Sequence, residues 1–166
     1  MIDDVRNMKF EKDIVIIVNQ NVIDNLKICV KKASPNEACG LLFGDIKEVQ
    51  VSEGFQYHYI AKKFECFESD KKSPVSFLIE NIERLNEVWQ NAAQKFSLRL
   101  ISIFHSHPAG SSPSGVDHAN MEFLDNCGNK AFKNQIWTIM DAQNFNLNAY
   151  IYYNEEIMKV AVEVNK

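Results

Sequence analysis

The first part of the chain alternates between strand-like and helix-like spacing of its apolar residues. A continuous β-branched run over residues 14–18 is typical of a buried strand. Apolar residues then recur at helical spacing over 21–33, and Ser34-Pro35 is a stop signal, so we expect a helix to end there. A short apolar run over 39–43 indicates a second strand.

The residues after this run predict a hairpin and then an exposed connection. Gly44-Asp45 is a turn signal, and residues 49–60 are rich in β-forming side chains. We therefore expect the chain to reverse at Gly44-Asp45 and to return as a strand over 49–60. Residues 61–73 are polar and mixed in charge, which favours a solvent-exposed loop.

The second half of the chain continues this mixture. Ser73-Pro74 is expected to open a long helix that runs to about Phe96 with one apolar stripe. A strand over 98–104 leads into a loop over 105–114 that is rich in Pro, Gly and Ser. The remaining elements are expected as a helix over 114–124 and strands over 136–140, 147–153 and 157–164. Because strands outnumber helices, the sequence predicts an α/β (α+β) fold in which helices pack on a mixed sheet.

Length and composition are those of one globular domain. The chain has 166 residues, 46% of them hydrophobic and 24% charged, so it can bury an ordinary core. The formal net charge of -4 gives no general attraction to phosphates, so nucleic acid is not an expected partner. No apolar run is long enough to span a bilayer, and residues 1–10 are too polar for a secretion signal. A cytoplasmic location without membrane contact is expected.

The four cysteines contain no Cys-x-x-Cys pair, so a cysteine zinc site is not expected. Without a secretion signal, a disulfide is not expected either. The sequence therefore predicts four reduced and mostly buried thiols at Cys29, Cys39, Cys66 and Cys127.

His105 and His107 form a His-x-His pair at the end of a predicted strand. Alternate side chains of an extended chain point the same way, so the two imidazoles can reach one ion, and Pro108 favours an extended His107. Asp117, in the first turn of the following helix, can supply a third ligand. Two histidines and one carboxylate leave one tetrahedral position for water, as in catalytic zinc sites.

Each part of this pattern also has an ordinary explanation. Two histidines in one loop are often only solvated side chains. Ser114 and Asp117 have the spacing of a capping box, which stabilises the start of a helix without any metal. Capping and ligation use different atoms, so the two interpretations are compatible.

Taken together, these residues resemble the JAMM motif of the MPN-domain metalloproteases. The similarity lies in His105-Ser106-His107-Pro108, in Pro113-Ser114-x-x-Asp117 and in the upstream segment Glu37-Ala38-Cys39-Gly40. The interval from His107 to Asp117 is one residue shorter than in typical members. The difference falls in the loop 109–112, which can shorten without moving the ligands.

The resemblance implies a fold. This is the MPN/JAMM fold, a mixed central sheet flanked by helices with a cytidine-deaminase-like architecture. It implies a single domain over residues 1–166, with its core over about 12–160.

The resemblance also implies a set of roles. One zinc ion per chain would be bound by His105, His107 and Asp117. Glu37 would act as general base on the zinc-bound water and then as acid to the leaving amine. Ser114 would donate a hydrogen bond to the oxyanion of the tetrahedral intermediate.

The substrate class follows from the same resemblance. Members of this kind cleave isopeptide or peptide bonds after the C-terminal Gly-Gly of ubiquitin or a ubiquitin-like protein, so such a protein is the expected partner. Residues 61–73 lie where the family's tail-contacting insertion falls, although a solvated loop also explains their composition. A peptidase that processes a sulfur-carrier protein with the same tail would use the same site.

Other functions are distinguished by particular residues. A non-catalytic MPN scaffold within a larger protein complex would generally lack the metal ligands, all of which are present. A base deaminase would need Pro-Cys-x-x-Cys after a His-x-Glu, and the chain has no such pattern. His58 and His118 are not expected to be ligands, because the site is complete without them.

Overall fold

A closed, mixed sheet forms the centre of the computed structural model, which describes residues 9–67 and 81–166. Its strands are β1 (Phe10–Asn19), β2 (Cys39–Val51), β3 (Gly54–Phe67), β4 (Arg99–His107), β5 (Ile136–Asp141), β6 (Leu147–Tyr153) and β7 (Glu156–Asn165). They follow the order β1-β3-β2-β4-β5-β6-β7, and β7 pairs with β1 to close the barrel. The pairs β1/β3, β1/β7 and β4/β5 are parallel, and the other four are antiparallel.

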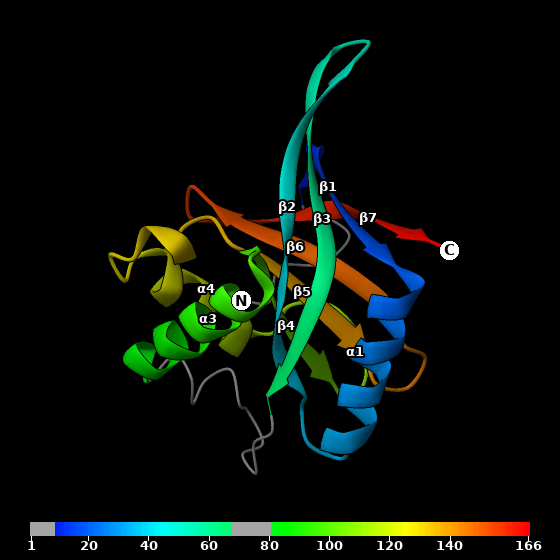
Figure 1. The fold of residues 1–166 in the computed structure, drawn as a ribbon, viewed down its shortest axis with the longest axis vertical. Coiled ribbons are helices and arrows are strands. Elements are labelled where there is room, and N and C mark those ends of the chain that lie inside the picture. Colours follow the sequence, from blue (N-terminus) through cyan, green and yellow to red (C-terminus); the bar gives the residue numbers. More distant parts are fainter. Residues whose placement is uncertain (1–8, 68–80) are drawn as a thin grey trace.

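Helices flank this sheet on two sides, as the sequence predicted (Figure 1). They are α1 (Gln20–Ala33), α3 (Ile82–Phe96), α4 (Gly115–Asp125) and the short 3-10 helix η2 (Lys130–Phe132). α1 packs on one side against β3, whereas α3 and α4 pack on the other. α1 begins where the Asn19 side chain accepts a hydrogen bond from Val22 N. In the described residues no helix is both long enough and apolar enough to cross a membrane.

Strand alternation divides the core into two clusters, one on each face of the sheet. In β2, Leu42 packs with the α1 side, whereas Leu41 and Phe43 pack with the α3 and α4 side. Successive residues of a strand point to opposite faces, so a strand covered on both faces must be apolar at every position. The continuous apolar run in this part of the sequence therefore reflects burial on both faces.

The predicted turn at Gly44-Asp45 is wrong, because β2 continues through it to Val51. The chain reverses at Ser52-Glu53, before Gly54 with its φ of 131°. Gly44 instead lies at a register shift, where a Cβ would overlap the carbonyl oxygen of Ile60. Close approach of two strands thus requires a glycine here, as a turn would. β2 and β3 extend as a long ribbon beyond the barrel (Figure 1).

Two other boundaries differ from expectation, and a third lies outside the described residues. Residues 61–67 belong to β3 rather than to an exposed loop, because they pair with β2, and residues 68–73 lie outside the described residues. The expected helix start at Ser73-Pro74 also lies outside them, and the helix is described from Ile82. The range His105–His107 ends strand β4 instead of opening a loop, because it pairs with β5.

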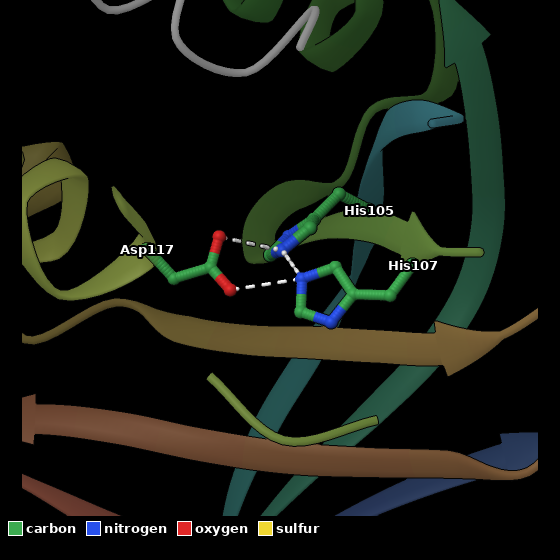
Figure 2. A group of neighbouring side chains, drawn as sticks. All are labelled: His105, His107 and Asp117. Atoms are coloured by element: carbon green, nitrogen blue, oxygen red, sulfur yellow. Dashed lines mark hydrogen bonds and ion pairs between the residues drawn. The ribbon is translucent and has the colours of Figure 1, made fainter. Parts of the chain in front are cut away.

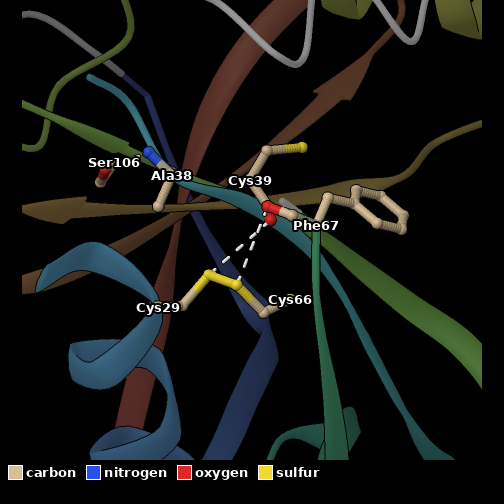
Figure 3. Close-up of a disulfide and its surroundings, with 6 residues drawn as sticks. All are labelled: Cys29, Ala38, Cys39, Cys66, Phe67 and Ser106. Atoms are coloured by element: carbon tan, nitrogen blue, oxygen red, sulfur yellow. Dashed lines mark hydrogen bonds between the residues drawn. A yellow bond between two sulfur atoms is a disulfide. The ribbon is translucent and has the colours of Figure 1, made fainter. Parts of the chain in front are cut away.

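The prediction of four reduced cysteines is also wrong, because Cys29 and Cys66 form a disulfide (Figure 3). Their Cα atoms lie 5.9 Å apart, within the range that a disulfide spans, although 37 positions separate them in sequence. The pair meets because α1 packs on β3, which sequence spacing does not reveal. Cys39 and Cys127 are free, and burial raises the pKa of the Cys39 thiol, so this thiol stays protonated.

Candidate metal centre

His105 and His107 lie at the end of β4 and point to the same side of the sheet. β4 pairs with β5 in parallel, so that His105 lies beside Ile139 and His107 beside Asp141. Only 1% of His105 and 9% of His107 is exposed, so both imidazoles are held inside the protein. Burial of two polar rings is unfavourable unless their nitrogen atoms have partners.

Asp117 reaches the histidines from the first turn of α4. Ser114 caps this helix: its Oγ accepts a hydrogen bond from Asp117 N at 3.1 Å, and Ser114 N donates to Asp117 Oδ2 at 2.8 Å. The capping box that the sequence predicted is therefore present. It orients a carboxylate that is only 5% exposed.

The three side chains converge on one point (Figure 2). His105 Nε2 lies 2.9 Å from Asp117 Oδ1, and His107 Nε2 lies 2.9 Å from Asp117 Oδ2. The two Nε2 atoms are 3.2 Å apart. The fold thus brings together the three residues expected to bind a metal, and their role as ligands stays a prediction.

This group of side chains fits a divalent metal ion. One donor atom from each residue lies within 4.8 Å of the others. A tetrahedral zinc ion with bonds of about 2.0 Å has ligand atoms about 3.3 Å apart, close to the separations found here. Imidazole nitrogen and carboxylate oxygen are both ligands that zinc accepts. His105, His107 and Asp117 can therefore hold one metal ion.

His107 and Asp117 change each other's protonation. Burial favours the neutral form of Asp117, yet hydrogen bonds from His105 and His107 hold the pKa of Asp117 well below its usual range. Burial also opposes the charged form of His107, but the hydrogen bond to Asp117 and the charge of that carboxylate raise the pKa of His107 above its ordinary value. The group thus stabilises positive charge beside Asp117.

Glu37 is half-buried just before β2, next to the end of β4 that carries the histidines. In the β2/β4 ladder, Cys39 pairs with His105. Burial raises the pKa of Glu37 and the charge of Asp117 adds to the rise, whereas His105 and His107 oppose it. The Glu37 carboxyl group is therefore within electrostatic range of all three candidate ligands.

Ser106, which sequence reasoning did not single out, ties the Glu37 segment to the histidine strand. Its Oγ accepts a hydrogen bond from Ala38 N at 2.8 Å, and its own N–H donates to Ala38 O at 3.0 Å. Figure 3 shows Ala38 and Ser106 near each other. A small hydroxyl residue between two candidate ligands was the sequence signal that could have identified it.

Asp141, at the end of β5, is a second residue that sequence reasoning missed. Its carboxylate accepts hydrogen bonds from Gly110 N at 2.8 Å and from Gln143 N at 2.7 Å. The backbone N–H groups of Gln143 and Gly110 hold the pKa of Asp141 below its ordinary value. The sequence pattern that could have identified Asp141 is an acidic residue directly after a predicted buried strand.

The other two histidines lie away from this group. His58 Nε2 is 3.3 Å from Gln56 Oε1, and the His118 ring packs edge-on against Tyr152. Neither histidine belongs to the cluster of candidate ligands among the described residues.

Solved structures of other proteins share this fold. The protein DSY2949 from Desulfitobacterium hafniense superposes with a TM-score of 0.64 at 17% sequence identity, over 92% of this chain and 93% of its own. AF2198, a JAB1/MPN domain protein from Archaeoglobus fulgidus, superposes with a TM-score of 0.50 at 14% identity, over 90% and 98%. A structure described as a JAMM metalloprotease-like zinc site in the proteasome and signalosome gives a TM-score of 0.48 at 14% identity, over 92% and 99%.

Sequence comparison identifies the family. No curated protein matches the chain. The profile of prokaryotic homologues of the JAB domain, however, matches residues 20–151, which include the candidate ligands, Glu37 and Ser114. The chain therefore belongs to the prokaryotic branch of the JAB/MPN domain family.

Proposed function

We propose that this protein is a zinc-dependent peptidase whose metal is held by His105, His107 and Asp117. The observation that carries the proposal is the convergence of two buried Nε2 atoms and an ionised carboxylate on one point. Three protein ligands would leave one coordination position for water, as in catalytic rather than structural zinc sites.

Glu37 is assigned the proton transfer. When bound, zinc polarises the substrate carbonyl and lowers the pKa of its water to near neutrality. The Glu37 carboxylate accepts the proton of the attacking water and then gives it to the leaving amine. A raised pKa suits both steps, because the group must be ionised to take the proton and acidic enough to return it.

Ser114 is assigned a hydrogen bond to the oxyanion of the tetrahedral intermediate. Its Oγ accepts a hydrogen bond from Asp117 N, and a hydroxyl group can accept and donate at the same time. Helix capping therefore leaves the Ser114 O–H able to donate to substrate.

The proposed substrate is the bond after the C-terminal Gly-Gly of a ubiquitin-like protein, in an isopeptide conjugate or a linear extension. The support for this class is the JAMM-type pattern from Glu37 to Asp117, together with membership of the JAB/MPN family. A sulfur-carrier protein with the same tail would present the same narrow peptide, and it is the second candidate. A cytoplasmic location is part of this proposal.

The substitution Glu37→Gln tests the proposal. The variant is expected to bind about one zinc ion per chain, as the wild type does, because no ligand is changed. Its cleavage of a panel of Gly-Gly-tailed conjugates and linear fusions should fall by at least about 100-fold. His107→Ala should lose both zinc and cleavage. Glu53→Gln, at the exposed end of the ribbon, is the matched control and should behave as wild type.

The outcomes separate the parts of the proposal. Wild-type cleavage by Glu37→Gln would show that Glu37 is not the proton carrier. A wild-type protein that takes up no zinc from excess would overturn the metal site. Zinc binding without cleavage of any tailed substrate would favour a different substrate or a scaffold role within a larger complex.

A further inference from the structure

The loop 108–114 joins the histidine strand β4 to helix α4, which carries Asp117. It contains no helix or strand, so the hydrogen bonds of regular structure do not hold it. An irregular segment has many conformations of similar energy, and most of them would carry Asp117 away from His105 and His107. The meeting of the three side chains therefore requires contacts that restrain the loop.

Three side chains from β5 and β6 provide these contacts. Asp141 Oδ2 accepts a hydrogen bond from Gly110 N at 2.8 Å. Asn148 Nδ2 donates to Ser111 Oγ at 2.7 Å, and the Tyr150 hydroxyl donates to Ser111 O at 2.8 Å. All three hydrogen bonds thus hold two successive residues in the middle of the loop.

The strand register places the three side chains on the face of the sheet that carries the histidines. Asn148 lies opposite Ile139 in the β5/β6 ladder, and His105 lies beside Ile139 in the β4/β5 ladder. Paired positions share a face, and alternate residues of a strand return to it, so Tyr150 and Asp141 lie on this face too. The loop therefore crosses the sheet beside the candidate metal centre.

The surroundings of these contacts make them costly to break. Tyr150 and Asp141 are buried, whereas Gly110 is exposed and Ser111 is half-buried. If the loop moved away, the buried Tyr150 hydroxyl and Asp141 carboxylate would lose hydrogen bonds that water would not readily replace. The hydrogen bond from Gly110 N to Asp141 has a charged acceptor, so it is expected to be the strongest of the three hydrogen bonds. Directly after β5, Ala142 N donates to His107 O at 2.9 Å, so the end of β5 also holds the end of β4.

We propose that Asp141, Asn148 and Tyr150 are positioning residues of the metal centre. They hold the loop at Gly110 and Ser111 so that the Asp117 carboxylate meets both imidazoles. This inference rests on the proposed function, because it requires that the three candidate ligands bind a metal. Loss of one of the three side chains loosens the loop and weakens metal binding, although every ligand is still present.

Tyr150→Phe is the mildest test, because it removes one hydroxyl and keeps the buried ring. Tyr153→Phe on the same strand is the matched control, since Tyr153 is 53% exposed. Zinc affinity is measured by competition with a chromophoric chelator. The absorption spectrum of the cobalt-substituted protein reports the ligand geometry, which a purely structural role would not alter.

We expect Tyr150→Phe to weaken zinc binding severalfold and Asp141→Asn to weaken it by about 10-fold or more, the range found when groups that orient metal ligands are changed. Both variants should show an altered cobalt spectrum, and Tyr153→Phe should not. Circular dichroism at the assay temperature shows which variants are folded. If Asp141→Asn is not, Tyr150→Phe and Asn148→Ala carry the test.

Two results would overturn the inference, and they differ in what they say about the proposed function. Wild-type zinc affinity and an unchanged cobalt spectrum in every folded variant would remove the positioning role, while the metal site would stand. A wild-type protein that binds neither zinc nor cobalt would remove the positioning role and the proposed function together.

Discussion

At the scale of single residues, His107 and Asp117 shift each other's protonation in opposite directions. Burial opposes the charged form of both, but the 2.9 Å contact between imidazole and carboxylate outweighs it, so folding raises the pKa of His107 and lowers that of Asp117. A metal ion bound at the proposed site would compete with a proton for the Nε2 atom of His107. The metal-free and metal-bound proteins should therefore respond differently to pH.

The stability of the metal-free protein is expected to fall as the pH rises from about 6.5 through the raised pKa of His107. The raised pKa of His107 contributes stability that is complete below the unfolded value of about 6.5 and is lost as the pH rises through the folded value. The lowered pKa of Asp117 contributes above about 3.9 and is lost only in acid, so it is constant over this range. Stabilisation by zinc should increase over the same range, because zinc needs a neutral imidazole. Thermal unfolding with chelator and with zinc measures both trends.

His107→Gln is the control for this prediction, because it removes the titrating group and keeps a polar side chain. The melting temperature of the variant in chelator should depend less on pH than that of the wild type. Equal pH dependence in the two proteins would contradict the assigned pairing of His107 with Asp117.

The sequence was sufficient to find the candidate ligands but not the residues that hold them in place. His105, His107 and Asp117 are close in sequence, and their spacing alone shows that they can converge. Asp141 contacts the loop at Gly110, and Ser106 contacts Ala38. These segments meet only because β4 pairs with β5 in parallel and with β2 in antiparallel. No local pattern records such pairing.

At the scale of elements, predictions succeeded where the determining signals are local. The apolar spacing of α1 and the stop at Ser34-Pro35 are both read within a few residues. The continuation of β2 through Gly44 and of β3 through residues 61–67 depends instead on pairing between the two strands. The sequence alone does not distinguish a glycine required by a close backbone contact, such as that of Gly44 with the Ile60 carbonyl, from a glycine required by a turn.

Gly44→Ala is therefore expected to destabilise the protein by at least about 2 kcal/mol, because the added Cβ overlaps backbone atoms of β3 that cannot move without breaking the ladder. Gly115→Ala is the control, since a Cβ there meets open space at the start of a helix. It should change the free energy of unfolding by less than about 0.5 kcal/mol. Urea denaturation measures both, and equal effects would show that Gly44 is not required by strand approach.

At the scale of the whole molecule, the barrel and its helices join segments that are distant in the sequence. β1 pairs with β7 near the two ends of the described chain. The disulfide between Cys29 and Cys66 joins α1 to β3 and closes a segment of 37 residues. In the unfolded chain this link removes conformational freedom, which favours the folded state.

Cys66→Ser is expected to lower the free energy of unfolding by about 3–4 kcal/mol, the loop-closure value for a segment of this length. Dithiothreitol should lower the stability of the wild type by a similar amount and leave that of the variant unchanged. Cys127→Ser, which removes a free thiol, is the control. Denaturation midpoints that are equal with and without reductant would show that Cys29 and Cys66 do not form a stabilising link.

The disulfide attaches α1 to β3 on one face of the sheet. The candidate metal centre brings together α4 and β4 on the other face. The first connection is made by oxidation, and the second would be strengthened by a bound ion. In a medium that is both reducing and poor in zinc, α1 would be held on the sheet by side-chain packing, and α4 by packing and by the contacts of Asp117 with His105 and His107. The stability with which α1 and α4 pack on the sheet would then depend on two independent conditions, the redox state and the zinc content of the medium.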